Sequence, residues 1–147
     1  MVMINTSIDE MNKLLGKKLT KEKYSDIAFK YGLDLDINGD ELNFETTSDR
    51  AELISKYGLA RLLSQLIHKP INVKDPKINE GISISVEKTE RPFVNCLLLR
   101  LKKELGERAS ELVEIQNKVD LVIGRRRGMA AIGLFDYDKI GFPIVYR

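Results

Sequence analysis

The stretch from Leu112 to Ile140, LVEIQNKVDLVIGRRRGMAAIGLFDYDKI, decides how the fold of this chain is interpreted. Its apolar residues recur first at three- and four-residue spacing, which predicts a helix over 109–123 that Gly124 ends. Three arginines follow, and then 129–135 is apolar enough for a central strand. The apolar face of the predicted helix consists of Leu112, Ile115, Val119 and Val122.

The segments on either side of this stretch predict further strands. Ile82, Ile84 and Val86 alternate with polar residues, as expected of a half-buried strand. The apolar run 92–101 predicts a second and more fully buried strand, with Cys96 as a small buried hydrophobe, and 143–146 predicts another strand. This half of the chain is therefore predicted as a small mixed β-sheet with one long helix.

The first half of the chain predicts a short strand followed by a helical hairpin. After the strand at 2–5, Ser7 and Glu10 form a capping-box pattern that opens a short helix ending at Gly16. Thr20 begins a second helix, and Gly32 supplies its left-handed cap.

A β-hairpin and a third helix are predicted next. Asn38 and Gly39 favour a type I′ turn between strands at 33–37 and 41–46. Asp49 and Glu52 suggest a capping box that opens a helix through Ile67, with a leucine-rich stripe. Gly58 lies inside this helix, and close backbone packing would explain it.

The fold class is therefore α+β, in two units. Residues 1–68 form an N-terminal unit with a helical hairpin, a β-hairpin and a helix, and residues 82–147 form the mixed β-sheet unit. Residues 69–81 contain two prolines and little periodicity, which is typical of a linker.

Composition indicates a cytoplasmic globular protein with no membrane segment. Hydrophobic residues make up 43% and charged residues 31% of the 147 residues, and no run is long and apolar enough to cross a bilayer. The net charge of +2 neither requires nor excludes a nucleic-acid partner, but residues 81–147 carry 12 Lys and Arg against 9 Asp and Glu.

The chain has few of the side chains that catalysis or metal binding needs. His68 is the sole histidine, so no histidine-based metal site or nucleophile pair can form within one chain. Two carboxylate pairs, Asp34 with Asp36 and Asp136 with Asp138, are better explained by a solvated strand face and a turn. We expect no catalytic residue, no metal and no cofactor.

Three arginines, Arg125, Arg126 and Arg127, are the main candidates for binding RNA or a protein partner. Guanidinium groups match phosphate bidentately, although cations beyond a helix C-terminus also stabilise the helix dipole. No aromatic residues interleave with these arginines, which argues against single-strand stacking. Arg50 and Arg61, on the predicted third helix, are further candidates.

Three segments resemble the N-terminal part of the β subunit of archaeal and eukaryotic phenylalanyl-tRNA synthetase. They are LGKKLTKEKYSDIAFKYGLDLD within 3–36, DRAELISKYGLAR at 49–61, and a third that starts at Arg91-Pro92. The third segment continues through IQNK at 115–118 to IGRRR at 123–127 and AIG at 131–133. Together they span nearly the whole chain in the order of that family.

The chain departs from the family at several positions. Asp120 and Phe135 replace two histidines, so any acid-base role of those histidines cannot be transferred. Ala51 and Tyr57 replace a proline and a glutamate, with less obvious consequences. In the family, the rest of a domain that hydrolyses mischarged tRNA follows this region, and the class II catalytic motifs lie in the α subunit.

The resemblance implies a non-catalytic module that binds tRNA or other RNA, or interacts with synthetase subunits, in translation. Alternatives are a truncated piece of a full β subunit, which would be a phenylalanine–tRNA ligase only within a longer chain, and a diverged paralogue. A minimal aminoacyl-tRNA editing hydrolase would use Asp136 or Asp138 as general base. A DNA-binding regulator would use the helix after Asp49, and a homo-oligomer would bury that helix's leucine stripe.

Overall fold

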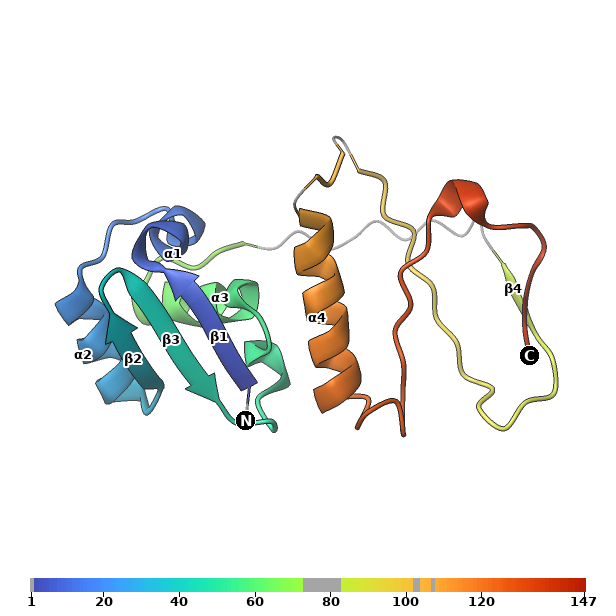
Figure 1. Ribbon diagram of the computed structural model, residues 1–147, viewed down its shortest axis with the longest axis horizontal. Helices are drawn as coiled ribbons and strands as arrows, with labels where there is room; N and C mark the ends of the chain where they lie inside the picture. Colours follow the sequence, from blue (N-terminus) through green and yellow to red (C-terminus); the bar gives the residue numbers. More distant parts are fainter. Residues whose placement is uncertain (1, 73–82, 102–103, 107) are drawn as a thin grey trace.

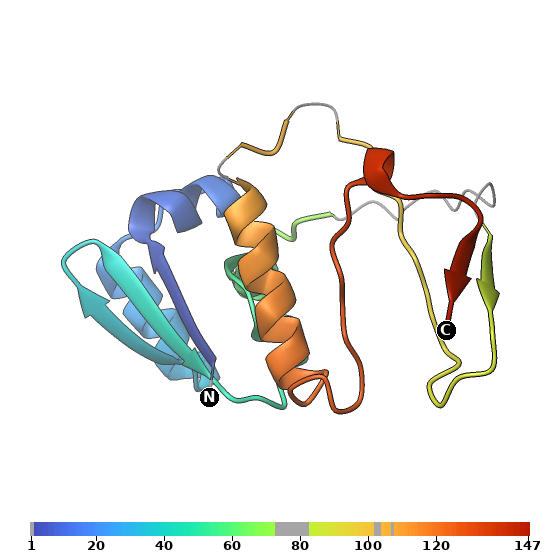
Figure 2. The ribbon, with the colours of Figure 1, turned by 45° about the vertical axis from the view of Figure 1, so that its right-hand side comes forward.

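The protein is described by a computed structural model that covers residues 2–72, 83–101, 104–106 and 108–147. Figure 1 shows an N-terminal body of helices packed on a small sheet, then the long helix α4 (Arg108–Val122), then the remaining strands. The same order is visible in the turned view of Figure 2. The predicted α+β class is confirmed.

The N-terminal sheet has three antiparallel strands in the order β1-β3-β2, so that β2 lies at an edge. These strands are β1 (Val2–Ser7), β2 (Asp34–Asn38) and β3 (Glu41–Thr46). Buried and exposed residues alternate along β1 and β3, because successive side chains point to opposite faces of a sheet. The register places Phe44 between Ile4 and Leu35, which directs these side chains to one face.

The hairpin turn differs by one residue from the predicted turn. Asn38 pairs with Glu41, so the two-residue loop is Gly39-Asp40 and not Asn38-Gly39. Only Gly39 has a positive φ, of 56°, whereas a type I′ turn requires positive φ at both loop residues. The type I′ prediction is therefore wrong, because a glycine at the first loop position suits the type II′ pattern.

Helices α1 (Ile8–Leu15) and α2 (Lys21–Tyr31) begin and end as predicted. The Ser7 and Thr20 hydroxyl groups accept hydrogen bonds from backbone N–H groups in the first turns, and Gly16 and Gly32 adopt left-handed caps. The Ser7 capping box is only half formed. The Glu10 carboxylate accepts from the Thr6 hydroxyl and an ammonium group instead of completing the box.

The helix predicted from Asp49 to Ile67 is divided in two. A short 3-10 turn, η1 (Ala51–Leu53), precedes α3 (Lys56–Leu66), and Ser55 caps α3 by accepting from the Gly58 N–H. A Cβ on Gly58 would collide with the carbonyl oxygen of Glu52. The predicted close packing at Gly58 is therefore confirmed, and this fold-back of η1 onto α3 explains why one continuous helix does not form.

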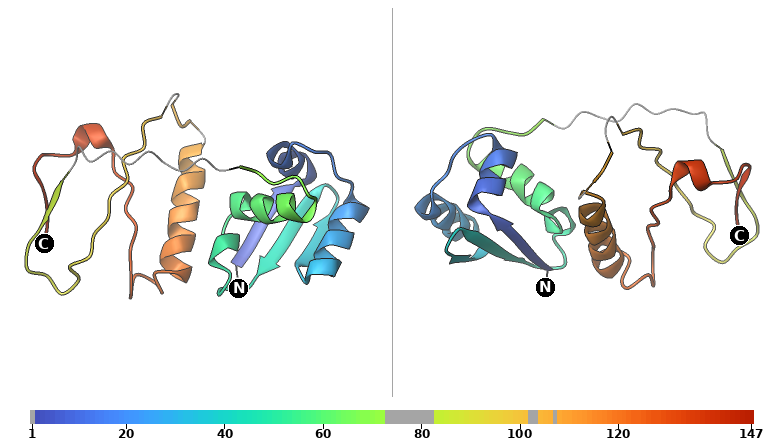
Figure 3. Two further views of the ribbon diagram at one scale, coloured as in Figure 1. Left: turned by 180° about the vertical axis from the view of Figure 1, so that it is seen from behind. Right: turned by 45° about the horizontal axis from the view of Figure 1, so that its top comes forward.

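One hydrophobic core holds the N-terminal unit together. The three helices pack on one face of the sheet, as the view from behind in Figure 3 shows. Each fully buried aliphatic or aromatic side chain contributes about 1.5–3 kcal/mol. The leucine stripe of α3 lies largely in this core and is not left over for an oligomer interface. The buried cluster consists of Ile4, Met11, Leu15, Leu19, Tyr24, Ile27, Leu42, Phe44, Leu59, Ala60 and Leu63.

The C-terminal half has fewer strands than predicted. Its elements are β4 (Ile84–Val86), α4, a 3-10 turn η2 (Tyr137–Lys139) and β5 (Ile144–Tyr146), and β4 pairs with β5 in parallel. The predicted strands at 92–101 and 129–135 are wrong, because neither segment pairs with a neighbour in the described part of the chain. Their apolar side chains are largely exposed, and so is Cys96, contrary to prediction.

The predicted linker lies mostly outside the described residues, which omit 73–82, so the division into units at 68 and 82 stays a prediction. No helix in the described ranges is long and apolar enough to span a membrane.

Candidate nucleic-acid interface

The three arginines form a left-handed turn directly after α4. Arg125, Arg126 and Arg127 have φ values of 46°, 57° and 64°. The left-handed conformation costs roughly 1–2 kcal/mol for each residue that has a side chain, so three in succession are held by their surroundings. We call residues 124–128 the arginine turn.

Close backbone contacts hold the start of this turn. Gly124 and Met129 close the loop, since the Met129 N–H donates to the Gly124 carbonyl at 2.9 Å. A Cβ on Gly124 would collide with the Ala130 carbonyl oxygen and would lie 2.7 Å from that of Asp120. Only glycine therefore fits at position 124, which agrees with its predicted place at the end of the helix.

Asp120 connects the turn to the segment that follows it. Asp120 is 5% exposed, and its carboxylate accepts from the Ile132 N–H at 2.8 Å and pairs with the Arg127 Nε at 3.0 Å. The Ile132 hydrogen bond and then Arg127 hold the pKa of Asp120 below its usual range. Gln116 of α4 donates to the Ile132 carbonyl at 2.8 Å, so both polar groups of Ile132 are bound.

The other two arginines of the turn are free to contact a ligand. The side chains of Arg125 and Arg126 are exposed, and neither makes an ion pair within the described ranges. Arg91 adds a further cation, because its Nη1 donates to the Arg127 carbonyl at 3.0 Å. The structure thus groups Arg91 with the arginine turn, which sequence spacing does not indicate.

The two remaining candidate arginines lie elsewhere. Arg50 precedes η1 and pairs with Glu52, while Arg61 is exposed on α3. No hydrogen bond or ion pair joins either of them to the arginine turn among the residues described. Their part in ligand binding stays a prediction.

Sequence reasoning missed a network that attaches α4 to the N-terminal unit. The Lys56 side chain, only 19% exposed, lies 2.6 Å from Glu10 Oε1 and 2.8 Å from Glu111 Oε1. Tyr57 donates its hydroxyl to Glu111 Oε2 at 2.6 Å. The position where Tyr57 departs from the family thus makes a contact between the two halves of the chain.

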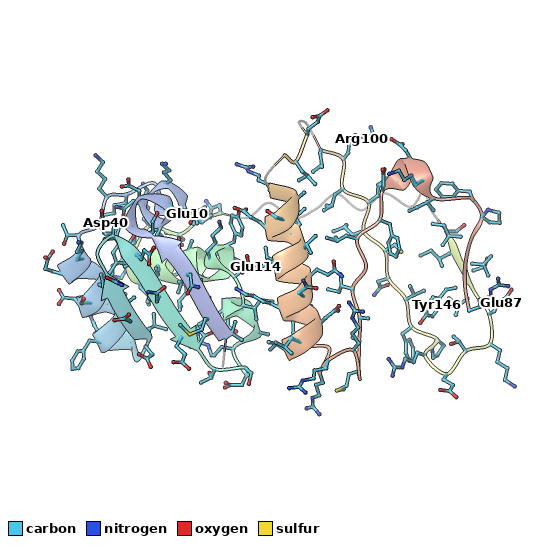
Figure 4. The ribbon with its side chains drawn as sticks, in the orientation of Figure 1. Glu10, Asp40, Glu87, Arg100, Glu114 and Tyr146 are labelled. Atoms are coloured by element: carbon cyan, nitrogen blue, oxygen red, sulfur yellow. The ribbon has the colours of Figure 1, made fainter. Side chains whose placement is uncertain are left out.

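The ionisation of this network is coupled. The hydrogen bonds from Lys56 lower the pKa values of Glu10 and Glu111. Although burial opposes its charge, hydrogen bonds to both carboxylates raise the pKa of Lys56. The Lys118 ammonium adds a second contact by donating to the Met3 carbonyl at 3.1 Å. Figure 4 shows Glu114, the ion-pair partner of Lys118, projecting from α4 toward the N-terminal unit.

The carboxylate pairs behave as their simpler interpretation predicts. Asp34 and Asp36 are exposed on β2, and Asp136 caps η2 by accepting from the Asp138 N–H at 3.2 Å. Asp136 also pairs with Lys139. In the described part of the chain, no three histidine, cysteine, aspartate or glutamate side chains gather as metal ligands.

Several known proteins are similar in sequence to this chain over most or all of its length. The phenylalanine–tRNA ligase β subunit of Methanocella arvoryzae is 33% identical over 153 aligned residues, which cover 100% of this chain and 28% of that subunit. That of Pyrobaculum aerophilum is 34% identical over 139 residues, covering 89% and 27%. A probable β subunit from Encephalitozoon cuniculi is 31% identical over 143 residues, covering 91% and 25%. No protein-family model matches the chain.

A solved structure supports the fold. A crystal structure of an N-terminal fragment of the phenylalanyl-tRNA synthetase β subunit from Pyrococcus horikoshii superposes with a TM-score of 0.68. The sequences are 24% identical, and the match covers 98% of this chain and 44% of that chain. The chain spans about a quarter of the length of the curated relatives. It is thus a relative of the phenylalanine–tRNA ligase β subunits and has the fold of their N-terminal fragment.

Proposed function

We propose that the chain is a non-catalytic module in translation, related to the N-terminal region of the synthetase β subunit, that binds tRNA through its arginine turn. The observation that carries this proposal is the run of three left-handed, side-chain-bearing residues at 125–127. Strained backbone of this kind persists at sites where the geometry of the side chains matters. Three adjacent guanidinium groups on such a turn suit a phosphate backbone.

The three arginine side chains of the turn have different roles. Arg125 and Arg126 contact phosphate groups, because they are exposed and unpaired among the described residues. Arg127 positions the turn through its ion pair with Asp120. This division makes Asp120 a positioning residue for RNA binding, in place of the histidine that the family has there.

Catalysis by the chain alone is not part of the proposal. Asp136 and Asp138 are exposed, and Asp136 is occupied by a helix cap and by Lys139, so neither has the buried setting that favours a general base. A DNA-binding role for α3 is equally unsupported, because Lys56 is engaged with two carboxylates and α3 packs in the core. We assign phenylalanine–tRNA ligation only to a larger assembly that includes the chain.

A filter-binding titration against phenylalanine tRNA and against an unrelated RNA tests the proposal. The double variant Arg125→Ala/Arg126→Ala should weaken tRNA binding about tenfold and reduce the slope of log K against log salt by roughly 0.7–0.9 for each lost contact. The matched control Lys13→Ala/Lys18→Ala removes the same charge elsewhere. Equal losses in both variants, or equal affinity for both RNAs, would contradict a site at the arginine turn.

Asp120→Asn separates a positioned turn from bulk charge. This change makes the protein more positive, so simple charge attraction predicts tighter RNA binding. A positioned turn predicts weaker binding, because Arg127 loses its ionic anchor while the amide can still accept from the Ile132 N–H. Circular dichroism checks that α4 remains folded.

A second candidate function, binding of another polypeptide, is favoured by the apolar surface of the C-terminal half. Phe93 is 95% exposed and Phe135 is 80% exposed, and Val86 and Val145 of the parallel pair β4-β5 are exposed although parallel sheets normally have both faces covered. We propose synthetase subunits as the partners. Hydrogen exchange at 93–101 and 129–135 should slow when the synthetase α or β subunit from the same organism is added. Unchanged exchange with both subunits would contradict this role.

A further inference from the structure

A hollow of about 310 Å³ opens on the N-terminal unit where helices α2 and α3 end. Its volume lies at the lower end of the range for ligand sites, about 300–1,000 Å³. In the views of Figure 1 and Figure 3, α2 lies at the β2 edge of the N-terminal sheet and α4 lies beyond the β1 edge, so this hollow is separate from the arginine turn. We call it the α2–α3 hollow.

Three lysine side chains lie around the hollow. Lys17, Lys23 and Lys30 line the hollow, and Asp26 is the one acidic residue among the described residues that line it. None of the three lysines makes an ion pair with any described residue, whereas nearby Lys21 pairs with Asp40 at 3.3 Å. Three lysines without an ion pair among the described residues therefore lie around this opening.

The floor of the hollow is apolar. Leu19 and Ile27, which belong to the buried core, line it together with Leu66 and Ile67, which pack against that core. Tyr31 forms a wall, is 43% exposed, and has the Lys30 ammonium 5.5 Å from the centre of its ring. An apolar floor beneath a cationic rim matches a ligand that carries an apolar group between negative charges.

The surrounding backbone favours carboxylates at the rim over phosphates buried inside. Helices α2 and α3 direct their C-terminal ends toward the hollow, and these ends carry partial negative charge that opposes a deeply bound anion. No arginine lines the hollow, although arginine is the residue best suited to bind phosphate bidentately. These features favour a peptide over a nucleic acid.

We propose that the α2–α3 hollow binds an acidic peptide segment of a partner protein, which inserts one large apolar side chain between Tyr31 and Ile67. Carboxylates on either side of that side chain pair with Lys17, Lys23 and Lys30. The site is independent of the RNA-binding proposal, because it uses other residues at the opposite edge of the sheet.

Fluorescence anisotropy with the labelled peptide Glu-Glu-Asp-Phe-Glu-Glu-Leu-Glu and the full chain tests this proposal. Binding should be measurable at low salt, should weaken as salt rises, and should fall at least about tenfold in Lys17→Gln/Lys23→Gln/Lys30→Gln. The matched control Lys13→Gln/Lys18→Gln/Lys88→Gln, which removes equal charge outside the hollow, should bind almost as the unmodified chain does.

Two further probes make the test decisive. A peptide with glycine in place of phenylalanine should bind at least about tenfold more weakly, because its apolar anchor is gone. Equal binding of both peptides, or equal losses in the two triple variants, would show charge attraction alone and overturn the proposal. Oligouridylate that binds more tightly than the peptide, and loses affinity in the hollow variant, would overturn it in favour of a nucleic-acid ligand.

Discussion

The two halves of the molecule differ in whether their apolar side chains are buried or exposed. Residues 2–72 bury theirs in one core of eleven side chains between a sheet and three helices. In the described part of 83–147, only Asp120 and Gly124 are buried, and sixteen of the twenty exposed large hydrophobic side chains belong to this half. Although both halves contain apolar strand-like runs, within the described residues only the first half covers them with packing partners.

This contrast indicates where stability and binding reside. The buried core cluster lies in the N-terminal half, whereas α4 is attached to that half by the Lys56–Glu111 ion pair and by the hydrogen bond from Lys118 to the Met3 carbonyl. Substitutions should therefore act on stability in the first half and on association in the second.

The largest effect is expected for a leucine at the centre of the core. Leu59 is 0% exposed, so Leu59→Ala should reduce the free energy of unfolding by about 2–5 kcal/mol. Leu99 is 60% exposed, and Leu99→Ala should change it by less than about 0.5 kcal/mol. Urea denaturation followed by circular dichroism measures both. Comparable losses of unfolding free energy in the two variants would mean that the two halves share one core, contrary to the difference in burial.

A smaller but still clear loss is expected at the fold-back of η1 onto α3. Gly58→Ala would place a methyl group against the Glu52 carbonyl and should cost about 1–3 kcal/mol by overpacking. Gly141→Ala is the control in the C-terminal half, because no atom lies within 4 Å of its added Cβ. Thermal unfolding should separate the two variants. An unchanged unfolding temperature in Gly58→Ala would contradict the tight contact between Gly58 and the Glu52 carbonyl.

Alkaline pH should affect the N-terminal core through Tyr24. Burial raises the pKa of Tyr24 from 10.0 to about 12, and its hydroxyl donates to Asn12 Oδ1 at 3.0 Å. The unfolded chain ionises this group first, so the stability it provides is complete below about pH 10 and is lost as the pH rises toward 12. Urea midpoints across this range measure the loss, and Tyr24→Phe, which cannot ionise, should show a weaker dependence.

The smallest effect is expected at the contact between the halves. Glu111→Gln removes one charge from the Lys56 network and should loosen α4 by about 0.2–1 kcal/mol, as for partly exposed ion pairs. Because the pKa values of Glu10 and Glu111 are lowered, this contribution is present above pH 4.5 and is lost as the pH falls through their folded pKa values. Hydrogen exchange of α4 amides measures it, with Glu114→Gln as the comparison. Faster exchange throughout β1 and β3 would instead indicate a defect of the core.

Local signals in the sequence predicted the N-terminal unit well. Its helix caps at Ser7, Thr20, Gly16 and Gly32 depend on residues close by in the sequence, so the local sequence pattern is enough to predict them. The break before α3 was missed, because it depends on contact between the Glu52 carbonyl and Gly58, which periodicity does not report. The β2–β3 turn lies one residue later than predicted, because its position is set by the pairing register of the two strands.

In the C-terminal half, apolar sequence runs alone do not predict strands correctly. An apolar run becomes a strand only when a neighbour takes up its backbone hydrogen bonds, and 92–101 and 129–135 find no such neighbour within the described residues. The arginine turn was placed correctly after the helix, but its left-handed backbone and its anchor at Asp120 depend on contacts with Ile132. The attachment of Lys56 to Glu111 joins positions 55 residues apart, beyond the reach of any local pattern.

The position of β2 at the edge of the N-terminal sheet has a consequence for behaviour at high concentration. No described strand pairs with its outer side, and a strand from another molecule can pair with an open edge of this kind, which is how sheets grow into aggregates. Asp34 and Asp36 are exposed along this strand, so a second copy pairing there would bring like charges together. We therefore expect these two carboxylates to disfavour pairing of β2 with a second copy.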